Sequence, residues 1–339
     1  MPPAVPARHR AIHTTHSTAW PLWIISRRVI AASLTTTWPA SWSSAKTRRS
    51  TTTAMTSAAT DYTVDELMAV CISRLVQDSE CVAQGIATPM VMAGFFLAKM
   101  THAPNLLFAS AIGMALTTHW SPLAISAVER GLQDHILIAP SFAQLVCEIL
   151  PTLQFKEFLR PAQIDAQGNT NNVAIGNYHH PRVRLPGSGG IPDVTSFSAN
   201  TYLYNPRHGR ASFVEKLDFI SGVGVGPEEE RRRLGIVSPG PRALLTDLGV
   251  FDFEGGRMRL LSYHPGTTIE RIQARTGFPI AIASDVHETP PPSEEEVRLL
   301  REVIDPLGVR KLETLGGADR WALLREIAQK ELGTDAGHG

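Results

Sequence analysis

Apolar residues recur at every third or fourth position in two early segments of the chain, and this spacing predicts two helices. The first begins at Thr63, because Thr63 and Glu66 have the spacing of a capping box. The second covers about 89–100 and begins behind Thr88 and Pro89, which suit the N-cap and N1 positions. Short apolar runs on either side of the second helix predict two buried strands: 81–84 and 105–110.

Beyond residue 150 the chain changes to short strand patterns separated by glycine turns. These patterns predict five strands: 158–164, 171–175, 212–220, 243–246 and 279–283. A hairpin is predicted over 250–261, around Gly255 and Gly256. Further helices are predicted in four places: near 121–133, near 141–150, from Thr267 to Gly277, and, as the final helix, from Ser293 to about 304. Early helix–strand alternation followed by hairpins favours an α/β domain with a mixed sheet.

Composition divides the chain near residue 60. Over all 339 residues, 32 basic side chains balance 32 acidic ones, and this zero net charge excludes a strongly basic nucleic-acid binder. The first sixty residues hold seven basic and no acidic residues, and the first acidic residue is Asp61. A hydrophobic fraction of 43% excludes global disorder, and no stretch is apolar enough for a polytopic membrane protein.

Three interpretations of residues 1–60 stay open: an upstream start with the native protein beginning at Met55, a disordered or targeting tail, and a folded module. The best apolar stretch, 20–25, is too short for a secretory signal or a membrane span. We expect residues 1–60 to form a disordered or non-native extension, 61–330 to form the α/β domain, and 331–339 to form a flexible tail.

The chain has three cysteines, Cys71, Cys81 and Cys147, and none has the spacing of a CxxC motif. We expect all three to be buried structural thiols. Reduced thiols fit a cytoplasmic location.

Two glycine-rich segments are candidates for anion binding. Gly222–Gly226 is followed by Pro227 and a charged run, and these do not form the apolar helix that a dinucleotide loop requires, so we expect a turn there. In 187–190 the glycines allow backbone N–H groups to converge on a phosphate or a thioester oxyanion, although a tight turn is the alternative.

Three other segments carry weaker signals. The pattern of 163–169 predicts a strand that ends in a polar turn. The sequence of 264–266 is a weak indication of a phosphate-binding site. The adjacent His179 and His180 are poorly spaced for binding one metal ion, so no metal site is predicted.

Taken in order, these segments resemble the β subunits of class I CoA-transferases, of which the glutaconate CoA-transferase β subunit is a named example. The matching segments before residue 221 are 85–89, 163–169, 175–181, 187–190 and 216–220. Those after it are 249–253, 264–266 and 301–306. The resemblance covers about 61–309 and includes nothing in 1–54.

The resemblance implies an open, mixed or parallel sheet with flanking helices, of the family I β-subunit type. It implies a homologous α subunit as partner, in an αβ or α2β2 assembly, with the active site between the subunits. The substrate would be a coenzyme A thioester, with no permanently bound cofactor and no nucleic-acid or membrane partner. Family members attack the thioester with a Glu at the end of the second strand, where this chain has Ala109. The neighbouring Ser110 has no identifiable base.

The family includes a related subfamily that also lacks this Glu and is similar to the ring-opening CoA hydrolases of bacterial steroid degradation. In that subfamily the resemblance implies that the α subunit supplies a carboxylate. We therefore expect C–C cleavage with water, with oxyanion donors at the backbone N–H groups of Gly189, Gly190 and Ile191. The expected contacts to substrate or CoA are six residues: Gly85, Ser110, Gln163, Asn169, Gly187 and Ser188. The alternatives are a true CoA-transferase whose nucleophile lies on the partner subunit, and a non-catalytic scaffold subunit.

Overall fold

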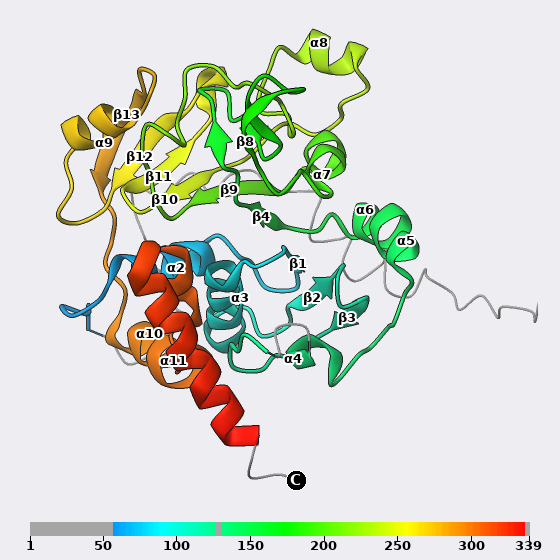
Figure 1. Cartoon of the computed structure of the whole chain (residues 1–339), viewed down its shortest axis with the longest axis vertical. Helices are drawn as coiled ribbons and strands as arrows, with labels where there is room; N and C mark the ends of the chain where they lie inside the picture. Colours follow the sequence, from blue (N-terminus) through cyan, green and yellow to red (C-terminus); the bar gives the residue numbers. More distant parts are fainter. Residues whose placement is uncertain (1–56, 127–129, 336–339) are drawn as a thin grey trace, which may run out of the picture.

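The computed structural model describes residues 57–126 and 130–335. Figure 1 shows two halves: helices gather around a small sheet in one, and a larger sheet with short helices forms the other. None of the helices within these two ranges is both long and apolar enough to cross a membrane.

The first half of the described chain follows the predicted alternation. Helix α2 (Val64–Arg74) begins at Thr63, whose backbone N–H donates to the Glu66 carboxylate at 2.8 Å. Thr88 is the N-cap of α3 (Pro89–Thr101), so both predicted helix starts are confirmed. Strand β1 (Cys81–Gln84) pairs in parallel with β2 (Leu107–Ser110), which pairs antiparallel with β3 (Ala115–Thr117).

Short helical segments follow β3. They are α4 (Arg130–Gln133), α5 (Phe142–Gln144), a π-helical turn (Leu145–Ile149) and α6 (Leu150–Leu153). The predicted helix near 141–150 is confirmed. Of the one near 121–133, residues 121–126 are not helical, 127–129 lie outside the described residues, and only Arg130–Gln133 form a helix.

The larger sheet has six strands in the order β13-β12-β11-β10-β9-β4. Its strands are β4 (Glu157–Leu159), β9 (Thr201–Asn205), β10 (Leu244–Thr246), β11 (Gly249–Asp252), β12 (Arg259–Tyr263) and β13 (Ala281–Glu288). Both parallel and antiparallel pairs occur, and β11 and β12 form the predicted hairpin around Gly255 and Gly256. The α/β class with a mixed sheet and flanking helices is therefore confirmed.

Smaller elements connect these strands. Two hairpins pair β5 (Gln163–Ile164) with β6 (Thr170–Asn171) and β7 (Ala174–Gly176) with β8 (Pro181–Arg184). The short helices of this half are α7 (Ile191–Phe197), α8 (Glu228–Arg233) and α9 (Ile269–Arg275), with a 3-10 turn at Glu254–Gly256.

The two sheets meet at a single parallel bridge between Val82 of β1 and Lys156, the residue before β4. The backbone N–H of Ala83 donates to the Lys156 carbonyl, and the N–H of Lys156 donates to the Cys81 carbonyl, both at 2.8 Å. The nine strands therefore run continuously from β3 through β1 and β4 to β13.

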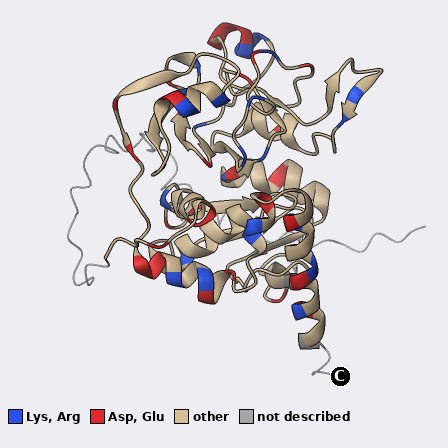
Figure 2. Cartoon of the chain, turned by 60° about the vertical axis from the view of Figure 1, so that its left-hand side comes forward, with Lys and Arg blue, Asp and Glu red and all other residues tan. Residues whose placement is uncertain are grey.

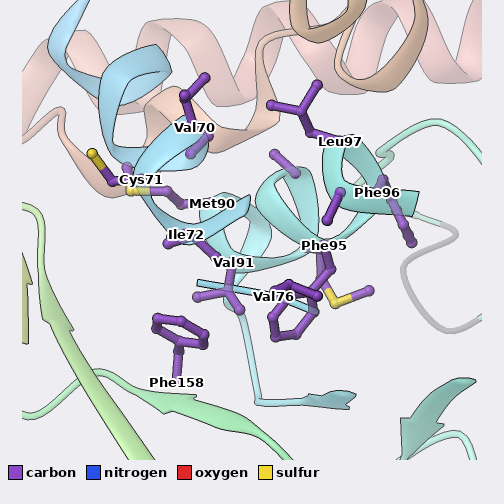
Figure 3. Packing of buried hydrophobic residues seen from close by; sticks show 14 of the residues in the cluster. Val70, Cys71, Ile72, Val76, Met90, Val91, Phe95, Phe96, Leu97 and Phe158 are labelled. Atoms are coloured by element: carbon purple, nitrogen blue, oxygen red, sulfur yellow. The ribbon is translucent and has the colours of Figure 1, made fainter. Parts of the chain in front are cut away.

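The largest apolar core lies where α2 and α3 cover both sheets. Figure 3 shows Phe158 of β4 facing Val91 of α3, and the Phe158 and Phe95 rings meet edge-on with centroids 5.8 Å apart. Phe158 also stacks on Tyr202 of the neighbouring strand β9. This face of the strands therefore packs against α2 and α3, whereas the opposite face of β1 and β2 packs against Val194 of α7.

Three predicted strands differ from the structure. The predicted strand 171–175 is divided between β6 and β7, and residues 172–173 belong to neither. The segment 158–164 is interrupted, because Pro161 has no N–H to donate to a neighbouring strand. The predicted strand 212–220 is wrong, since only Phe213 makes a bridge, to Ile164. Beyond Phe213 only Leu217 is buried, so the segment has no continuous apolar side to hold it in a sheet.

The predicted helix behind Ser293 is confirmed as α10 (Glu294–Arg298) and a π-helical turn (Leu299–Ile304), but it is not the final helix. A 3-10 turn (Val309–Glu313) and helix α11 (Gly317–Asp335) follow it. Residues 331–335 continue α11, in the segment where we expected a flexible tail. Residues 1–56 and 336–339 lie outside the described residues, and 57–60 lie beside Pro292 and Ser293.

A buried charge cluster ties α2 to the C-terminal segment. Arg310 is 1% exposed and forms ion pairs at 2.8 Å with Glu66 of α2 and with Asp305. Charge pairing therefore holds the C-terminal segment against α2.

Charges on the outside are of mixed sign in the view of Figure 2, with basic and acidic side chains interspersed over both halves.

The cysteines are only partly as predicted. Cys71 and Cys81 are buried, and burial raises the pKa of their thiols to about 11 and about 12. Cys147 is exposed, which corrects the expectation of a third buried thiol. Its π-helical turn packs on the molecule through Leu145 and leaves Cys147 facing solvent.

Candidate functional site

Ala109 lies in β2, in register with Ala83 of the parallel strand β1. Its side chain is 1% exposed and belongs to an apolar cluster with Cys81, Phe155 and Val194. Because Val194 belongs to α7, the face of β1 and β2 that carries Ala109 is covered by the helix behind the glycine segment 187–190. Ala109, at the candidate nucleophile position, therefore shares an apolar cluster with the helix that follows the candidate anion loop.

Ser110 is buried and shapes the turn that ends β2. Its Oγ accepts a hydrogen bond of 3.0 Å from the backbone N–H of Gly113. This hydrogen bond explains why a hydroxyl is buried directly after Ala109, and the explanation requires no catalytic role for Ser110.

The segment Gly187–Gly190 forms an open turn before α7. Gly187 and Gly189 have φ angles of +114° and +54°, a region that favours glycine. The N–H of Ile191 donates to the Ser188 carbonyl at 3.0 Å, and the N–H of Gly187 donates to the Asn172 carbonyl at 2.9 Å. This corrects the expectation for Ile191, whose N–H is used within the turn.

Gly189 and Gly190 remain as the candidate donors. Within the described chain their backbone N–H groups form no hydrogen bond. No atom lies within 4 Å of the position that a side chain would occupy at either residue. The turn is therefore accessible to a ligand or to a partner subunit.

Gln163 and Asn169 are held inside the domain. The Gln163 Oε1 atom accepts from Asn171 at 2.9 Å. Asn169 donates to the Asp165 carboxylate at 2.8 Å and accepts from the N–H of Gly224 at 2.8 Å. Both side chains therefore support the turn that follows β5.

The same contacts explain the Gly222–Gly226 segment. A side chain at Gly224 would lie 2.1 Å from the Gln167 carbonyl oxygen, so only glycine fits this close approach of two backbones. The segment is an irregular connection that is bridged to Thr170 at Gly222, and not the turn that we expected.

Gly85 opens the loop between β1 and α3, where the Thr88 hydroxyl donates to the Gly85 carbonyl at 3.0 Å. A side chain at Gly85 would lie 3.8 Å from Oε1 of Glu157. Glu157 is the first residue of β4, and burial raises the pKa of its carboxyl to about 7. The sequence analysis missed Glu157, although a lone acid between Phe155 and Phe158 was a visible signal.

Comparison of the sequence with known proteins identifies the family to which the chain belongs. Residues 66–275 match the family model described as coenzyme A transferase. The chain belongs to the coenzyme A transferase family. It is 33% identical to the B subunit of 3-oxoadipate CoA-transferase from Pseudomonas knackmussii over 71% of this chain and 92% of that protein.

Two other members of this family have different named activities. The cholesterol ring-cleaving hydrolase IpdB subunit of Mycobacterium tuberculosis is 30% identical over 73% of this chain and 97% of that protein. The crystal structure of glutaconate coenzyme A-transferase from Acidaminococcus fermentans has a TM-score of 0.65 and 28% identity, over 76% of this chain and 99% of that one. The resemblance to CoA-transferase β subunits, and the fold it implied, are confirmed.

The histidine of the segment 264–266 lies in the core of the domain. His264 is buried, and its ring nitrogens contact the Thr289 hydroxyl at 3.0 Å and the Thr246 carbonyl at 2.9 Å. Burial lowers its pKa to about 4, so it is a neutral core residue and not a phosphate ligand. In residues 57–126 and 130–335, no three His, Cys, Asp or Glu residues lie together as metal ligands would.

Proposed function

We propose that the chain is the β subunit of a heteromeric enzyme that cleaves an acyl-CoA substrate with water and does not transfer its CoA. The observation that carries this proposal is the buried methyl group of Ala109, which the resemblance to the family assigns to the position of its nucleophilic Glu. A methyl group cannot form the acyl anhydride and glutamyl thioester through which a transferase works. The name of the IpdB relative, a ring-cleaving hydrolase, supports the same reaction class.

The glycine turn suits a reaction in which negative charge develops on a carbonyl oxygen. Addition of water to a carbonyl carbon creates a tetrahedral oxyanion, and backbone N–H groups that need no reorganisation stabilise it well. The unused N–H groups of Gly189 and Gly190 are the donors that this chain offers. Loss of one such donor lowers kcat by about 10²–10³.

A homologous α subunit would complete the site, in an αβ or α2β2 assembly. Exposed apolar residues gather at the turn between β2 and β3 and along the segment that pairs with β3: Ile112, Met114, Ile136, Leu137 and Ile138. An exposed apolar patch beside an edge strand is a typical protein-binding surface. This patch begins three residues after Ala109, so a bound subunit would lie at the end of β2.

The reaction class is tested with the purified complex of this chain and its α subunit. We expect ring-opened or hydrolysed product from an acyl-CoA substrate without any acceptor acid, as followed by mass spectrometry. A CoA ester of an added carboxylic acid would contradict the proposal and indicate a transferase. Failure of acyl-CoA to raise the melting temperature of the complex would indicate a scaffold subunit.

The oxyanion site is tested with Gly190→Val. Gly190 has a φ of −84° and open space around it, so valine fits the fold but shields the N–H groups. We expect kcat to fall by about 100-fold or more. The control is Gly226→Val, since Gly226 is also exposed with open space around it. Activity of Gly190→Val within about threefold of the control would refute the oxyanion assignment.

A further inference from the structure

We propose that Glu157 is a catalytic carboxylate of this chain, which takes a proton from the attacking water and returns it to the leaving fragment. This inference rests on the proposed hydrolytic function and deepens it. It assigns the proton transfer to the β subunit itself.

The first argument is strand register. Lys156 is bridged to Val82, so Glu157 follows at the level of Ala83, and Ala83 is paired with Ala109. Glu157, Ala83 and Ala109 therefore lie side by side across three parallel strands. Residues at one level of a parallel sheet point to the same face, and two strand spacings separate the outer ones by about 10 Å. The Glu157 carboxylate thus shares the face of Ala109.

The residues on either side of Glu157 support this orientation. Lys156 points to the other face, where its ammonium pairs with Glu80 at 2.6 Å and lies over the Tyr202 ring. Phe158 also points to that face and packs on Phe95 of α3. Side chains alternate along a strand, so Glu157 lies opposite both.

The second argument is the contact with the loop behind β1. Glu157 Oε1 lies 3.8 Å from the position of a side chain at Gly85, so the carboxylate stands against the Gly85 backbone. This loop connects β1 to α3, and its resemblance to the family made Gly85 a candidate substrate contact. Glu157 as a whole residue is half-buried.

The third argument is the absence of a partner. Other buried carboxylates of this chain have partners: Glu313 pairs with Arg160 at 2.6 Å, Glu66 and Asp305 pair with Arg310, and Asp165 accepts from the Asn169 amide at 2.8 Å. Within the described residues no hydrogen bond or ion pair reaches the Glu157 side chain. An ionised carboxylate that is buried without a partner costs free energy, and such a group is therefore a candidate functional residue.

The surrounding groups favour proton exchange at neutral pH. Burial is the cause that raises the Glu157 pKa to about 7, close to the value that suits a general base. On the neighbouring strands the titratable groups are Cys81, held neutral by a pKa of about 12, and three groups that face away: Tyr202, Tyr204, which donates to Glu313, and Lys156. On α7 the one titratable residue, Asp193, is exposed.

A second unpartnered polar atom stands beside Glu157. Thr201 of β9 is paired in register with Glu157, and its buried Oγ1 has no hydrogen-bond partner. Because paired residues of parallel strands share a face, this hydroxyl and the carboxylate are neighbours. Two such groups at one level suit a site that orients a water molecule.

The proton balance of the step is simple. As the water oxygen adds to the substrate carbonyl carbon, one O–H bond breaks and the proton goes to the Glu157 carboxylate. The carbonyl oxygen becomes an alkoxide, which the N–H groups of Gly189 and Gly190 stabilise. When the C–C bond breaks, the alkoxide becomes a carboxylic acid carbonyl, and Glu157 returns the proton to the carbon that leaves. One water molecule is consumed, and Glu157 ends in its starting state.

The test uses the αβ complex carrying Glu157→Gln, Glu157→Asp, or the control Glu229→Gln, which changes an exposed carboxylate of α8. In the wild-type complex we expect kcat to rise with pH around a midpoint near 7. Glu157→Gln should lower kcat by about 100-fold or more and remove this pH dependence, with KM preserved. Glu157→Asp should keep part of the activity and the pH dependence, and the control should match the wild type.

The possible results separate the two proposals. If the wild-type complex hydrolyses the substrate, and Glu157→Gln does so within about threefold with the same pH profile, the inference is overturned and the proposed function stands. If the wild-type complex only transfers CoA to an acceptor, both are refuted. A melting temperature for each variant shows whether a loss of activity comes from unfolding, and in that case the pH profile of Glu157→Asp decides.

Discussion

The unpaired carboxylate of Glu157 should make the fold less stable at alkaline pH, and Glu157→Gln should remove this penalty. The folded-state pKa is about 7, against an ordinary value of 4.5. Protonation therefore favours the folded state, and the stability it gives is present below about 4.5 and lost as the pH rises through 7. One pKa unit corresponds to about 1.4 kcal/mol, so the full penalty above pH 8 is at most about 3.5 kcal/mol.

Urea unfolding of the full chain at pH 5 and pH 8 measures this effect. Between these pH values the stability of Glu157→Gln relative to the wild type should increase by about 2–3 kcal/mol. Every other titrating group is common to the two proteins, so it cancels in the comparison. Water that reaches the carboxylate makes the change smaller, but its sign is fixed. A stability difference that is the same at both pH values would refute the burial of an ionisable Glu157.

Two further predictions concern the buried charges and the thiols. Arg310→Met should lower the free energy of unfolding by about 3–5 kcal/mol, because it leaves Glu66 and Asp305 buried without their cation. The exposed Arg298→Met should cost less than about 1 kcal/mol in the same urea titration, and equal effects would contradict the network. A thiol reagent should modify only Cys147 of the three cysteines in the native chain and all three after unfolding, and rapid labelling of Cys71 would contradict its burial.

Local signals in the sequence predicted the elements that they specify directly. The spacing of Thr63 and Glu66 fixed a helix start, and Gly255–Gly256 fixed a hairpin, because caps and turns depend on residues close together in the chain. Helix α11 was missed because its apolar residues do not form one stripe: Trp321 and Leu332 are both more than 60% exposed.

The candidate site was predicted less completely, since its geometry depends on contacts between distant segments. The sequence drew attention to the glycine turn, but not to the use of the Ile191 N–H within that turn. Gln163 and Asn169 looked like ligand contacts because they are polar and close to glycine, yet their partners lie inside the domain. Glu157 acquires its position from the pairing of β4 with β1, which no local pattern specifies.

The single bridge between the two sheets also has a consequence for the order of folding. The hydrogen-bonded residues Cys81 and Lys156 are about 75 positions apart in the chain, so the loop between them must close before they can pair. The hairpin of β11 and β12 and the pair α2 and α3 join residues that are near neighbours, and such contacts form faster. Each sheet can therefore assemble by itself, and Glu157 reaches the level of Ala109 only in a late step that docks one sheet on the other.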